Sequence, residues 1–119
     1  MSTLTKTYDQ YEVVKIPFPF ADIETTKVRP ALILSSAKQF NAKIGVSVMA
    51  MITSKKVKQD PWPGDIAIED LQSTGLPYPS IIRFKLFTLD HRLILERLGK
   101  LTERDIERIQ KKLKEIFVI

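Results

Sequence analysis

An arginine stands directly before a proline that opens an apolar stretch of this chain, in the run Val28-Arg29-Pro30 that continues through Leu34. A proline disfavours helical backbone at the residue before it, so Pro30 favours extended backbone at Arg29. The apolar residues that follow are typical of a strand anchored in a core. The pattern predicts a guanidinium held at the mouth of a rigid strand, planar, always protonated and able to bind a phosphate with two donors at once. The alternative for Arg29 is a structural ion pair with a nearby acid.

The length of 119 residues predicts one domain over 1–119, with a polar and flexible segment at 1–10. An apolar content of 44% fits a globular protein, and no run approaches the roughly 18 apolar residues that a membrane helix needs, so we expect no membrane contact. The chain has no cysteine, which excludes disulfides, a thiol nucleophile and zinc–thiolate sites. With no apolar leader behind Met1, we expect a protein of the cytoplasm.

The net charge of +5 and the pI of about 9.5 favour a polyanionic partner electrostatically. The alternative is that this charge serves solubility alone. Charge by itself names no ligand.

Alternation of apolar and polar residues predicts a first strand, which ends early or lies at an edge because Pro17 and Pro19 cannot donate to a ladder. The third strand is apolar on both faces, so we expect one face on the core and the other under a covering element or a partner, with dimerisation as one use. The strands are predicted at 12–18, 30–35, 43–53, 65–69, 80–89 and 94–98.

The last element is predicted to be a helix that begins after Thr102. The spacing from Thr102 to Asp105 is that of a capping box, with Asp in place of the usual Glu, and Leu101 and Ile106 occupy the staple positions that flank it. An apolar stripe follows at Ile106, Ile109, Leu113 and Ile116. Several short strands and one terminal helix indicate the α+β class, and we predict a small SH3-like β-barrel of five to seven strands with the C-terminal helix packed against it.

A second arginine, Arg83, interrupts an otherwise apolar strand. Arginine is rarely buried unless paired, so its alternative is an ion pair with an acid such as Glu12 or Asp65. Thr53 and Ser54 end the longest strand, where a hydroxyl binds a phosphate oxygen or simply caps the strand end.

A basic loop follows that strand, and its lysines suit a nucleic-acid backbone or a solvated surface equally. Trp62 lies between two prolines and either stacks on a base or plugs the open end of the barrel. The residues predicted to bind RNA are Lys27, Ser54, Lys55, Lys56, Lys58 and Trp62. The single histidine, His91, is predicted to lie in a solvated turn, and it offers neither a Ser-His-Asp triad nor a metal cluster.

Taken together, these motifs resemble the MazF/PemK-type toxins, the ribonuclease half of type II toxin–antitoxin pairs. The resemblance runs in order from residue 12 to about residue 110. Its motifs are Val14 to Phe20, Val28 to Leu34, Ile52-Thr53-Ser54, Trp62 to Asp65, Gly75 to Ser80, Thr88-Leu89-Asp90 and the helix entry from Gly99 to Asp105.

The resemblance implies an SH3-like barrel, a homodimer and sequence-specific cleavage of single-stranded RNA, usually messenger, with no metal or other cofactor. In such enzymes the 2′-hydroxyl attacks its own phosphate and leaves a 2′,3′-cyclic phosphate. Arg29 matches the active-site arginine of the family and Thr53 its active-site threonine, while Arg83 matches an arginine that some members use in catalysis. A cognate acidic antitoxin, disordered until bound, is the implied protein partner.

The sequence departs from the family at one point that matters for chemistry. Some members carry an aspartate two residues after the second arginine as general base, whereas here Phe84, Lys85 and Leu86 follow Arg83 with no acid. Asp22 and Glu24, in the polar loop at 21–27, are the other candidate carboxylates for a general base. The departure leaves a second function open, a non-catalytic SH3-like barrel that binds RNA or a protein partner.

Overall fold

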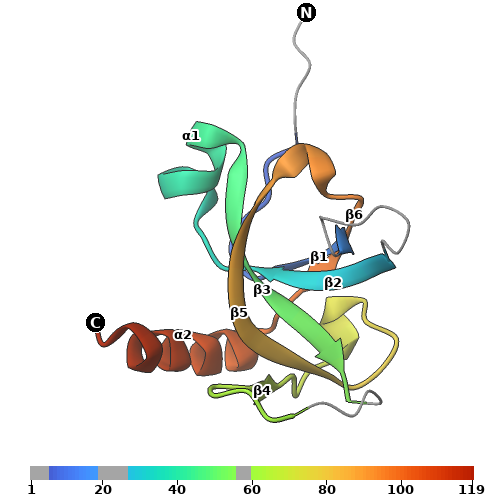
Figure 1. Ribbon diagram of the computed structural model, residues 1–119, viewed down its shortest axis with the longest axis vertical. Helices are drawn as coiled ribbons and strands as arrows, with labels where there is room; N and C mark the ends of the chain where they lie inside the picture. Colours follow the sequence, from blue (N-terminus) through green and yellow to red (C-terminus); the bar gives the residue numbers. More distant parts are fainter. Residues whose placement is uncertain (1–5, 19–26, 56–59) are drawn as a thin grey trace, which may run out of the picture.

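A single antiparallel sheet dominates the computed structural model, which describes residues 6–18, 27–55 and 60–119. Within these residues, six strands lie in the order β4-β5-β3-β2-β1-β6 and curl into a half-barrel, with the helix α2 against one face (Figure 1). This confirms the predicted α+β class and SH3-like barrel. The elements are β1 (Glu12–Phe18), β2 (Lys27–Ile33), α1 (Ala42–Ile44), β3 (Val46–Ser54), β4 (Ile66–Ala67), β5 (Ser80–Asp90), β6 (Glu96–Lys100) and α2 (Glu103–Phe117).

The third strand begins later than predicted, because 37–44 is helical. Ser36 caps this segment by accepting a hydrogen bond from the backbone N–H of Gln39 at 3.1 Å, and the buried Asn41 side chain donates to the carbonyl of Tyr8 at 2.7 Å. Gly45, with φ of 71°, then turns the chain into β3. The prediction of a strand from residue 43 was therefore wrong for its first three residues.

The other strands differ from prediction mainly at their ends. β1 spans the predicted residues, and β5 extends one residue further than predicted, to Asp90. β2 starts three residues earlier than predicted, so Arg29 lies within a strand, as the proline at position 30 favours. β4 is only Ile66–Ala67, and β6 is displaced to Glu96–Lys100.

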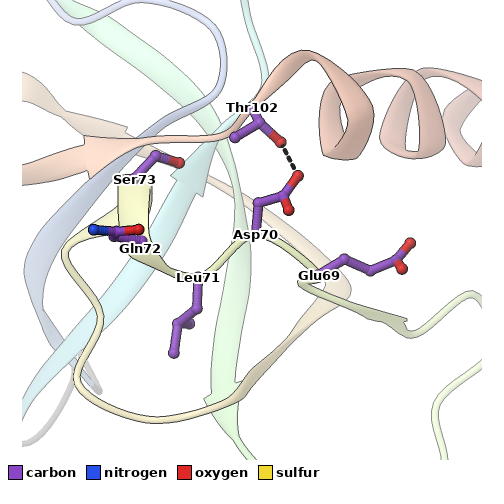
Figure 2. A pocket seen from close by; sticks show the side chains of 6 residues that line it. All are labelled: Glu69, Asp70, Leu71, Gln72, Ser73 and Thr102. Carbon is purple, nitrogen blue, oxygen red and sulfur yellow. Dashed lines mark hydrogen bonds between the residues drawn. The ribbon is translucent and has the colours of Figure 1, made fainter.

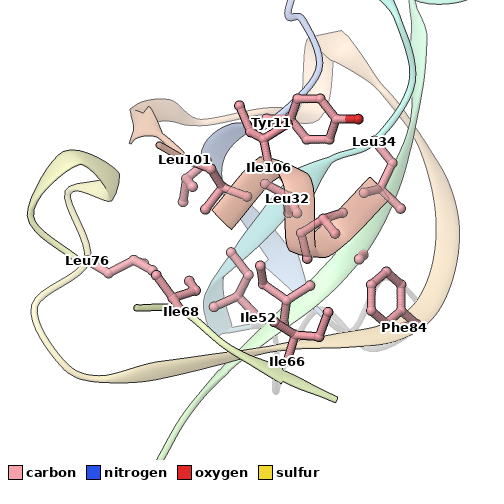
Figure 3. Packing of buried hydrophobic residues seen from close by; sticks show 14 residues of the cluster. Tyr11, Leu32, Leu34, Ile52, Ile66, Ile68, Leu76, Phe84, Leu101 and Ile106 are labelled. Atoms are coloured by element: carbon pink, nitrogen blue, oxygen red, sulfur yellow. The ribbon is translucent and has the colours of Figure 1, made fainter. Parts of the chain in front are cut away.

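The two faces of the sheet carry two separate apolar clusters. The face covered by α2 packs residues such as Leu32 and Ile52 with Ile106 of the helix (Figure 3). The opposite face holds a second cluster, which consists of Tyr8, Val14, Ile16, Ala31, Ile33, Met49, Leu89 and Ile94. Because side chains alternate along a strand, β3 contributes to both clusters, which confirms its predicted two-sided burial.

Two glycines bring β6 against the turn at Gln72–Thr74. A Cβ atom on Gly99 would lie 2.2 Å from the carbonyl oxygen of Ser73, and one on Gly75 would lie 2.2 Å from that of Leu98. Ser73 Oγ also donates to the carbonyl of Lys100 at 2.6 Å. This close approach of β6 to the turn requires the absence of a side chain at both glycines.

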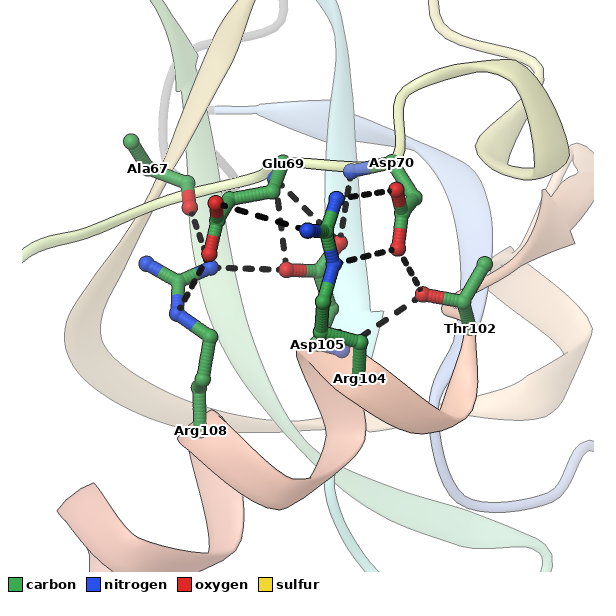
Figure 4. Close-up of polar contacts among 7 residues, drawn as sticks. All are labelled: Ala67, Glu69, Asp70, Thr102, Arg104, Asp105 and Arg108. Atoms are coloured by element: carbon green, nitrogen blue, oxygen red, sulfur yellow. Dashed lines mark hydrogen bonds and ion pairs between the residues drawn. The ribbon is translucent and has the colours of Figure 1, made fainter.

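Helix α2 begins as predicted, but its cap works differently. Thr102 Oγ1 accepts from the backbone N–H of Asp105 at 3.5 Å. The Asp105 carboxylate does not return the bond to Thr102, so the predicted capping box was wrong. It accepts instead from the backbone N–H groups of Glu69, at 3.2 Å, and Asp70, at 2.9 Å, and pairs with Arg108 at 2.7 Å (Figure 4). The helix cap thus also ties α2 to the segment that follows β4.

Tyr8 of the N-terminal segment and His91 are buried, whereas the sequence predicted a flexible segment at 1–10 and a solvated turn at His91. Tyr8 is buried in the second cluster, and its ring meets that of His91 edge-on at 5.3 Å between centroids. His91 is only 4% exposed, and its Nε2 lies 2.6 Å from Ser47 Oγ. Burial lowers the pKa of His91 below its usual value. Residues 1–5 lie outside the described part of the chain.

Helices that could cross a membrane were not found in the described part of the chain, where none is long and apolar enough.

Candidate functional site

A cleft of about 230 Å³ opens on the face of the sheet opposite α2, at one end of the second apolar cluster. Along β2, Arg29 shares this face with Ala31, and along β3, Thr53 shares it with Met49, because side chains two residues apart point the same way. The residues that line the cleft are Phe18, Arg29, Met51, Ile52, Thr53, Arg83 and Lys85. The structure thus brings the three predicted catalytic residues, Arg29, Thr53 and Arg83, into one cleft.

The missing N–H of Pro30 explains why the sheet parts at this point. The backbone N–H of Leu34 donates to the carbonyl of Val48 at 2.8 Å. Because alternate residues of a strand turn their hydrogen-bonding groups to the same side, the residues two and four positions earlier, at 32 and 30, also face β3. Pro30 has no N–H to give there. The ladder between β2 and β3 accordingly ends at Ala31, opposite Met51.

If the register of β2 and β3 is continued for two more residues, Arg29 lies opposite Thr53 across the opening between the strands. On its other side Arg29 remains paired with Ile16 of β1. The guanidinium is solvent-exposed, and no ion pair of Arg29 occurs within the described residues, so the alternative of a structural pair finds no support there.

A bulge in β5 shapes the opposite wall of the cleft. Ala50 of β3 pairs with Leu86, but the next residue, Met51, pairs with Arg83, which leaves two extra residues on β5. A bulge of this kind bends the strand and re-aims its side chains. Phe84 turns into the core beneath α2, while Arg83 and Lys85 both line the cleft.

Lys85 is the charged residue of the cleft lining that the sequence motifs did not predict. Its signal was present, since it follows Arg83 by two residues in the same apolar strand and so shares its face. In this chain Lys85 adds a third cation to the cleft lining, beside Arg29 and Arg83.

Arg83 is held by an ion pair, as the alternative interpretation of the sequence expected. The carboxylate of Asp65 accepts from its Nε at 3.1 Å and from its Nη2 at 2.8 Å, and the carbonyl of Asp60 accepts from Nη2 at 3.0 Å. The hydrogen bond to Asp65 raises the pKa of Arg83 above its ordinary value. Glu12, the other candidate partner, pairs with Arg97. Arg83 is therefore a fixed, permanent charge in the wall of the cleft.

The residues predicted to bind RNA border the cleft without lining it, where they are described. Lys27 lies exposed two residues before Arg29, and Ser54 and Lys55 follow Thr53 directly. The backbone N–H of Lys55 donates to the carbonyl of Pro79 at 2.9 Å. Lys56 and Lys58, like Asp22 and Glu24, lie outside the described residues.

Trp62 packs against the bulge of β5. Its indole N–H donates to the carbonyl of Phe84 at 3.3 Å, and Lys85 Nζ lies 4.7 Å from the ring centroid. The indole still has 40% of its surface exposed. It lies beside the cleft, next to Lys85.

A larger pocket of about 590 Å³ lies at the start of α2, between that helix and the segment after β4 (Figure 2). Its polar side chains serve the fold, since Asp70 accepts from Thr102 at 2.5 Å and from Arg104 at 2.5 Å. Among the described residues, no three His, Cys, Asp or Glu side chains gather into a group that could hold a metal ion. The cleft on the opposite face of the sheet is the better candidate site.

Solved structures of toxins share this fold. One is MazF from Deinococcus radiodurans, with a TM-score of 0.71 at 22% identity over 96% of this chain and 99% of that one. A second is a MazE–MazF complex from the same organism, with a TM-score of 0.73 at 21% identity, also over 96% and 99%. A third is an endoribonuclease from a mycobacterial species in complex with its cognate antitoxin, with a TM-score of 0.72 at 16% identity over 94% and 96%.

The sequence itself matches a family model over residues 9–117, a span that takes in the whole sheet, the cleft and α2. Among proteins with curated descriptions, none matches the sequence. The matched span contains each of the motifs on which the resemblance rested. The chain therefore belongs to the family of PemK-like, MazF-like toxins of type II toxin–antitoxin systems.

Proposed function

We propose that this chain is an endoribonuclease toxin that cleaves single-stranded messenger RNA at specific sequences. The observation that carries the proposal is the shared cleft of Arg29, Thr53 and Arg83 on three neighbouring strands. Two guanidinium groups and a hydroxyl around one small cleft match the donors that a phosphodiester accepts.

The reaction in this proposal is an internal transfer of the phosphoryl group. The 2′-hydroxyl loses its proton, its oxygen bonds to the adjacent phosphorus, and the bond to the 5′-oxygen breaks as that oxygen takes up a proton. The products are a 2′,3′-cyclic phosphate and a 5′-hydroxyl. Arg29 and Arg83 stabilise the additional negative charge of the phosphorane, and Thr53 Oγ1 donates to a non-bridging oxygen.

The cleft is rich in cations and poor in proton acceptors. The carboxylate of Asp65 lies beside the cleft in the described part of the chain, and it is engaged by Arg83. Arginine is a poor proton acceptor, because its guanidinium stays protonated. In this proposal most of the acceleration comes from preorganised positive charge, without a metal ion, and Asp22 or Glu24 remains the candidate base.

The rim of the cleft extends the RNA site. Lys27, Ser54 and Lys55 flank the catalytic strands, and with Lys56 and Lys58 they are proposed to hold the neighbouring phosphates. The affinity for single-stranded RNA should then fall with salt, with a log–log slope of about −0.7 for each phosphate contacted.

An apolar surface at the far end of α2 supports the proposed homodimer. A groove of about 280 Å³ is lined by Leu34, Ser35, Val48, Leu86, Leu113, Phe117 and Ile119, and Phe117 is 53% exposed. The apolar stripe of α2 continues beyond the buried core, since Ile109 is buried and Ile116 is 40% exposed. Sedimentation should report twice the chain mass of 13.7 kDa, and Phe117→Asp should return the mass to that of one chain.

A cognate acidic antitoxin is the proposed regulator in the cytoplasm. One of the similar structures is an endoribonuclease in complex with its cognate antitoxin, and another is a MazE–MazF complex. An acidic segment that folds on the basic cleft would block it electrostatically and sterically. Co-expression of a small acidic protein encoded next to this chain should restore growth and co-purify with it.

Expression of the chain in bacteria tests the proposed activity. We expect growth arrest and cleaved messenger RNA with the parent chain, and neither with Arg29→Ala. A toxicity of Arg29→Ala equal to that of the parent would remove Arg29 from the mechanism.

The absence of a carboxylate from the cleft lining within the described residues favours one other function, an RNA-binding barrel without catalysis. Purified protein incubated with end-labelled RNA in EDTA separates the two functions. Fragments with 5′-hydroxyl ends support the ribonuclease, and salt-sensitive binding without fragments supports the RNA-binding barrel.

A further inference from the structure

Trp62 is fixed beside the cleft with part of its ring open to solvent. Its indole N–H is bonded to the carbonyl of Phe84 at 3.3 Å, and its backbone N–H donates to the Asp65 carboxylate at 3.2 Å. Prolines on both sides restrict the backbone. The ring nevertheless remains 40% exposed. The structure therefore presents a rigid aromatic surface that the fold does not fully cover.

Lys85 connects this surface with the cleft. Its ammonium lies 4.7 Å from the centroid of the Trp62 ring, as a cation–π contact. The same side chain lines the cleft together with Arg29 and Arg83. A lysine ammonium is a point charge on a flexible stem of four carbons, so it reaches either position by rotation about its own bonds.

We propose that Trp62 is the stacking platform for a nucleobase next to the scissile phosphate, and that Lys85 exchanges the indole for a phosphate when RNA enters. The proposal rests on the proposed function, because it places the reacting phosphate in the cleft. A cation–π contact at an exposed site is weaker than the stacking of a base on an aromatic ring, and the ammonium is drawn to the phosphate. Both side chains thus gain a stronger partner when RNA binds.

The platform selects unpaired bases. A base within a duplex is stacked on its neighbours and cannot lie on a protein ring, whereas a base in a single strand can be splayed out onto one. Stacking tolerates every base, since each has a flat face. The Trp62 platform should therefore supply affinity and the preference for single strands, while base-edge contacts elsewhere set the cleavage sequence.

Intrinsic fluorescence tests the proposal directly, because Trp62 is the only tryptophan of the chain. The probe is a short single-stranded 2′-O-methyl RNA, which lacks the attacking hydroxyl, labelled with fluorescein for anisotropy. We expect its binding to quench the Trp62 emission with the same midpoint that anisotropy gives. A duplex of the same sequence should quench far less at equal occupancy.

Variants provide a second measurement. Trp62→Ala should weaken binding of the probe by about 5- to 150-fold, and Trp62→Phe should retain most of the affinity. Tyr78→Ala is the matched control and should change the affinity little. Tyr78 is another exposed aromatic residue between two prolines, whereas Trp62 is the one whose ring contacts Lys85 of the cleft lining. Lys85→Met should lower the salt slope by about 0.7.

Abasic nucleotides placed one at a time in the probe identify the stacked base. Loss of that one base should weaken binding to the parent chain and have no further effect on Trp62→Ala. Circular dichroism of each variant at the assay temperature confirms that it is folded. If Trp62→Ala does not fold, Trp62→Phe keeps the test valid.

The outcomes separate this proposal from the proposed function. RNA that binds, or is cleaved, without a change in Trp62 emission would overturn the platform and leave the ribonuclease in place. RNA that neither binds nor is cleaved would overturn both. Quenching by an acidic antitoxin but not by RNA would assign the Trp62 surface to the protein partner and overturn the nucleobase platform.

Discussion

Asp65 accepts two hydrogen bonds from Arg83, at 3.1 Å from Nε and 2.8 Å from Nη2. These hydrogen bonds link the turn that contains Trp62 and Asp65 to Arg83 in the wall of the cleft. It also explains how a nearly buried guanidinium is tolerated in an apolar strand, since buried arginine is normally paired. In the proposed reaction Asp65 is therefore a positioning residue, which would act on the phosphate through Arg83.

We expect Asp65→Ala to lower kcat by up to about 100-fold, because a guanidinium displaced by about 1 Å no longer matches the phosphorane. Asp65→Asn keeps an acceptor oxygen and should recover part of the rate. Steady-state cleavage of a fluorogenic RNA gives kcat and KM for each variant. If Asp65→Ala cleaved at the parental rate, the pair would be structural alone.

Pro30→Ala should close the end of the cleft. The new N–H faces β3 and lets the ladder continue past Ala31 and Met51, which narrows the opening between Arg29 and Thr53. We expect about a tenfold loss of cleavage rate with the free energy of unfolding changed by less than about 1 kcal/mol.

Hydrogen exchange measures the effect, since the amide at position 30 should be protected in Pro30→Ala. Pro17→Ala is the matched control, because its new N–H faces away from β2, on the side where the carbonyl of Lys15 accepts from Leu95 at 2.8 Å. A slowly exchanging amide at position 30 with unchanged cleavage would disprove the role of Pro30 in opening the cleft.

Asp105→Ala should cost about 2–4 kcal/mol of unfolding free energy. The carboxylate is 1% exposed, and its removal leaves the backbone N–H groups of Glu69 and Asp70 and the Arg108 guanidinium without their acceptor. Urea unfolding followed by circular dichroism gives the value. Lys111→Ala, an exposed change on the same helix, serves as the control and should have little effect.

Stability should fall as the pH is lowered through the range in which His91 titrates. Burial lowers the pKa of His91 in the folded state below the unfolded value of about 6.5, so the unfolded chain binds more protons there. The free energy of unfolding is then insensitive to His91 above about pH 7 and declines below about pH 6.5.

His91 is the only histidine, so His91→Gln should flatten this decline. Urea midpoints at several pH values between pH 5.5 and pH 7.5 test it. An equal slope in the parent and the variant would assign the pH dependence to other groups. Asp90, whose pKa Arg92 lowers to about 2, contributes only at more acidic pH, since its stabilisation is lost as the pH falls below about 4.

Local patterns were enough for some of the elements and for Arg29 of the candidate site. Alternation gave the bounds of β1, and the N-cap at Thr102 gave the start of α2. The proline after Arg29 gave an extended arginine on an anchored strand. These features depend on neighbours in the sequence, whose backbone preferences are short-range.

Contacts between distant residues were beyond such patterns. The bulge that sends both Arg83 and Lys85 into the cleft depends on the register with β3, and Asp105 caps backbone groups 35 and 36 residues away in preference to its own helix. The sequence around His91 is typical of a solvated turn, but in the folded chain its ring contacts Tyr8 and Ser47.

The chain's composition and periodicity were sufficient to specify strands, a terminal helix and the residue types of the proposed phosphate site, because each depends on runs of a few residues. The assembly of those groups into one cleft was settled by folding, since the pairing of strands determines which side chains share a face and which acid reaches which arginine.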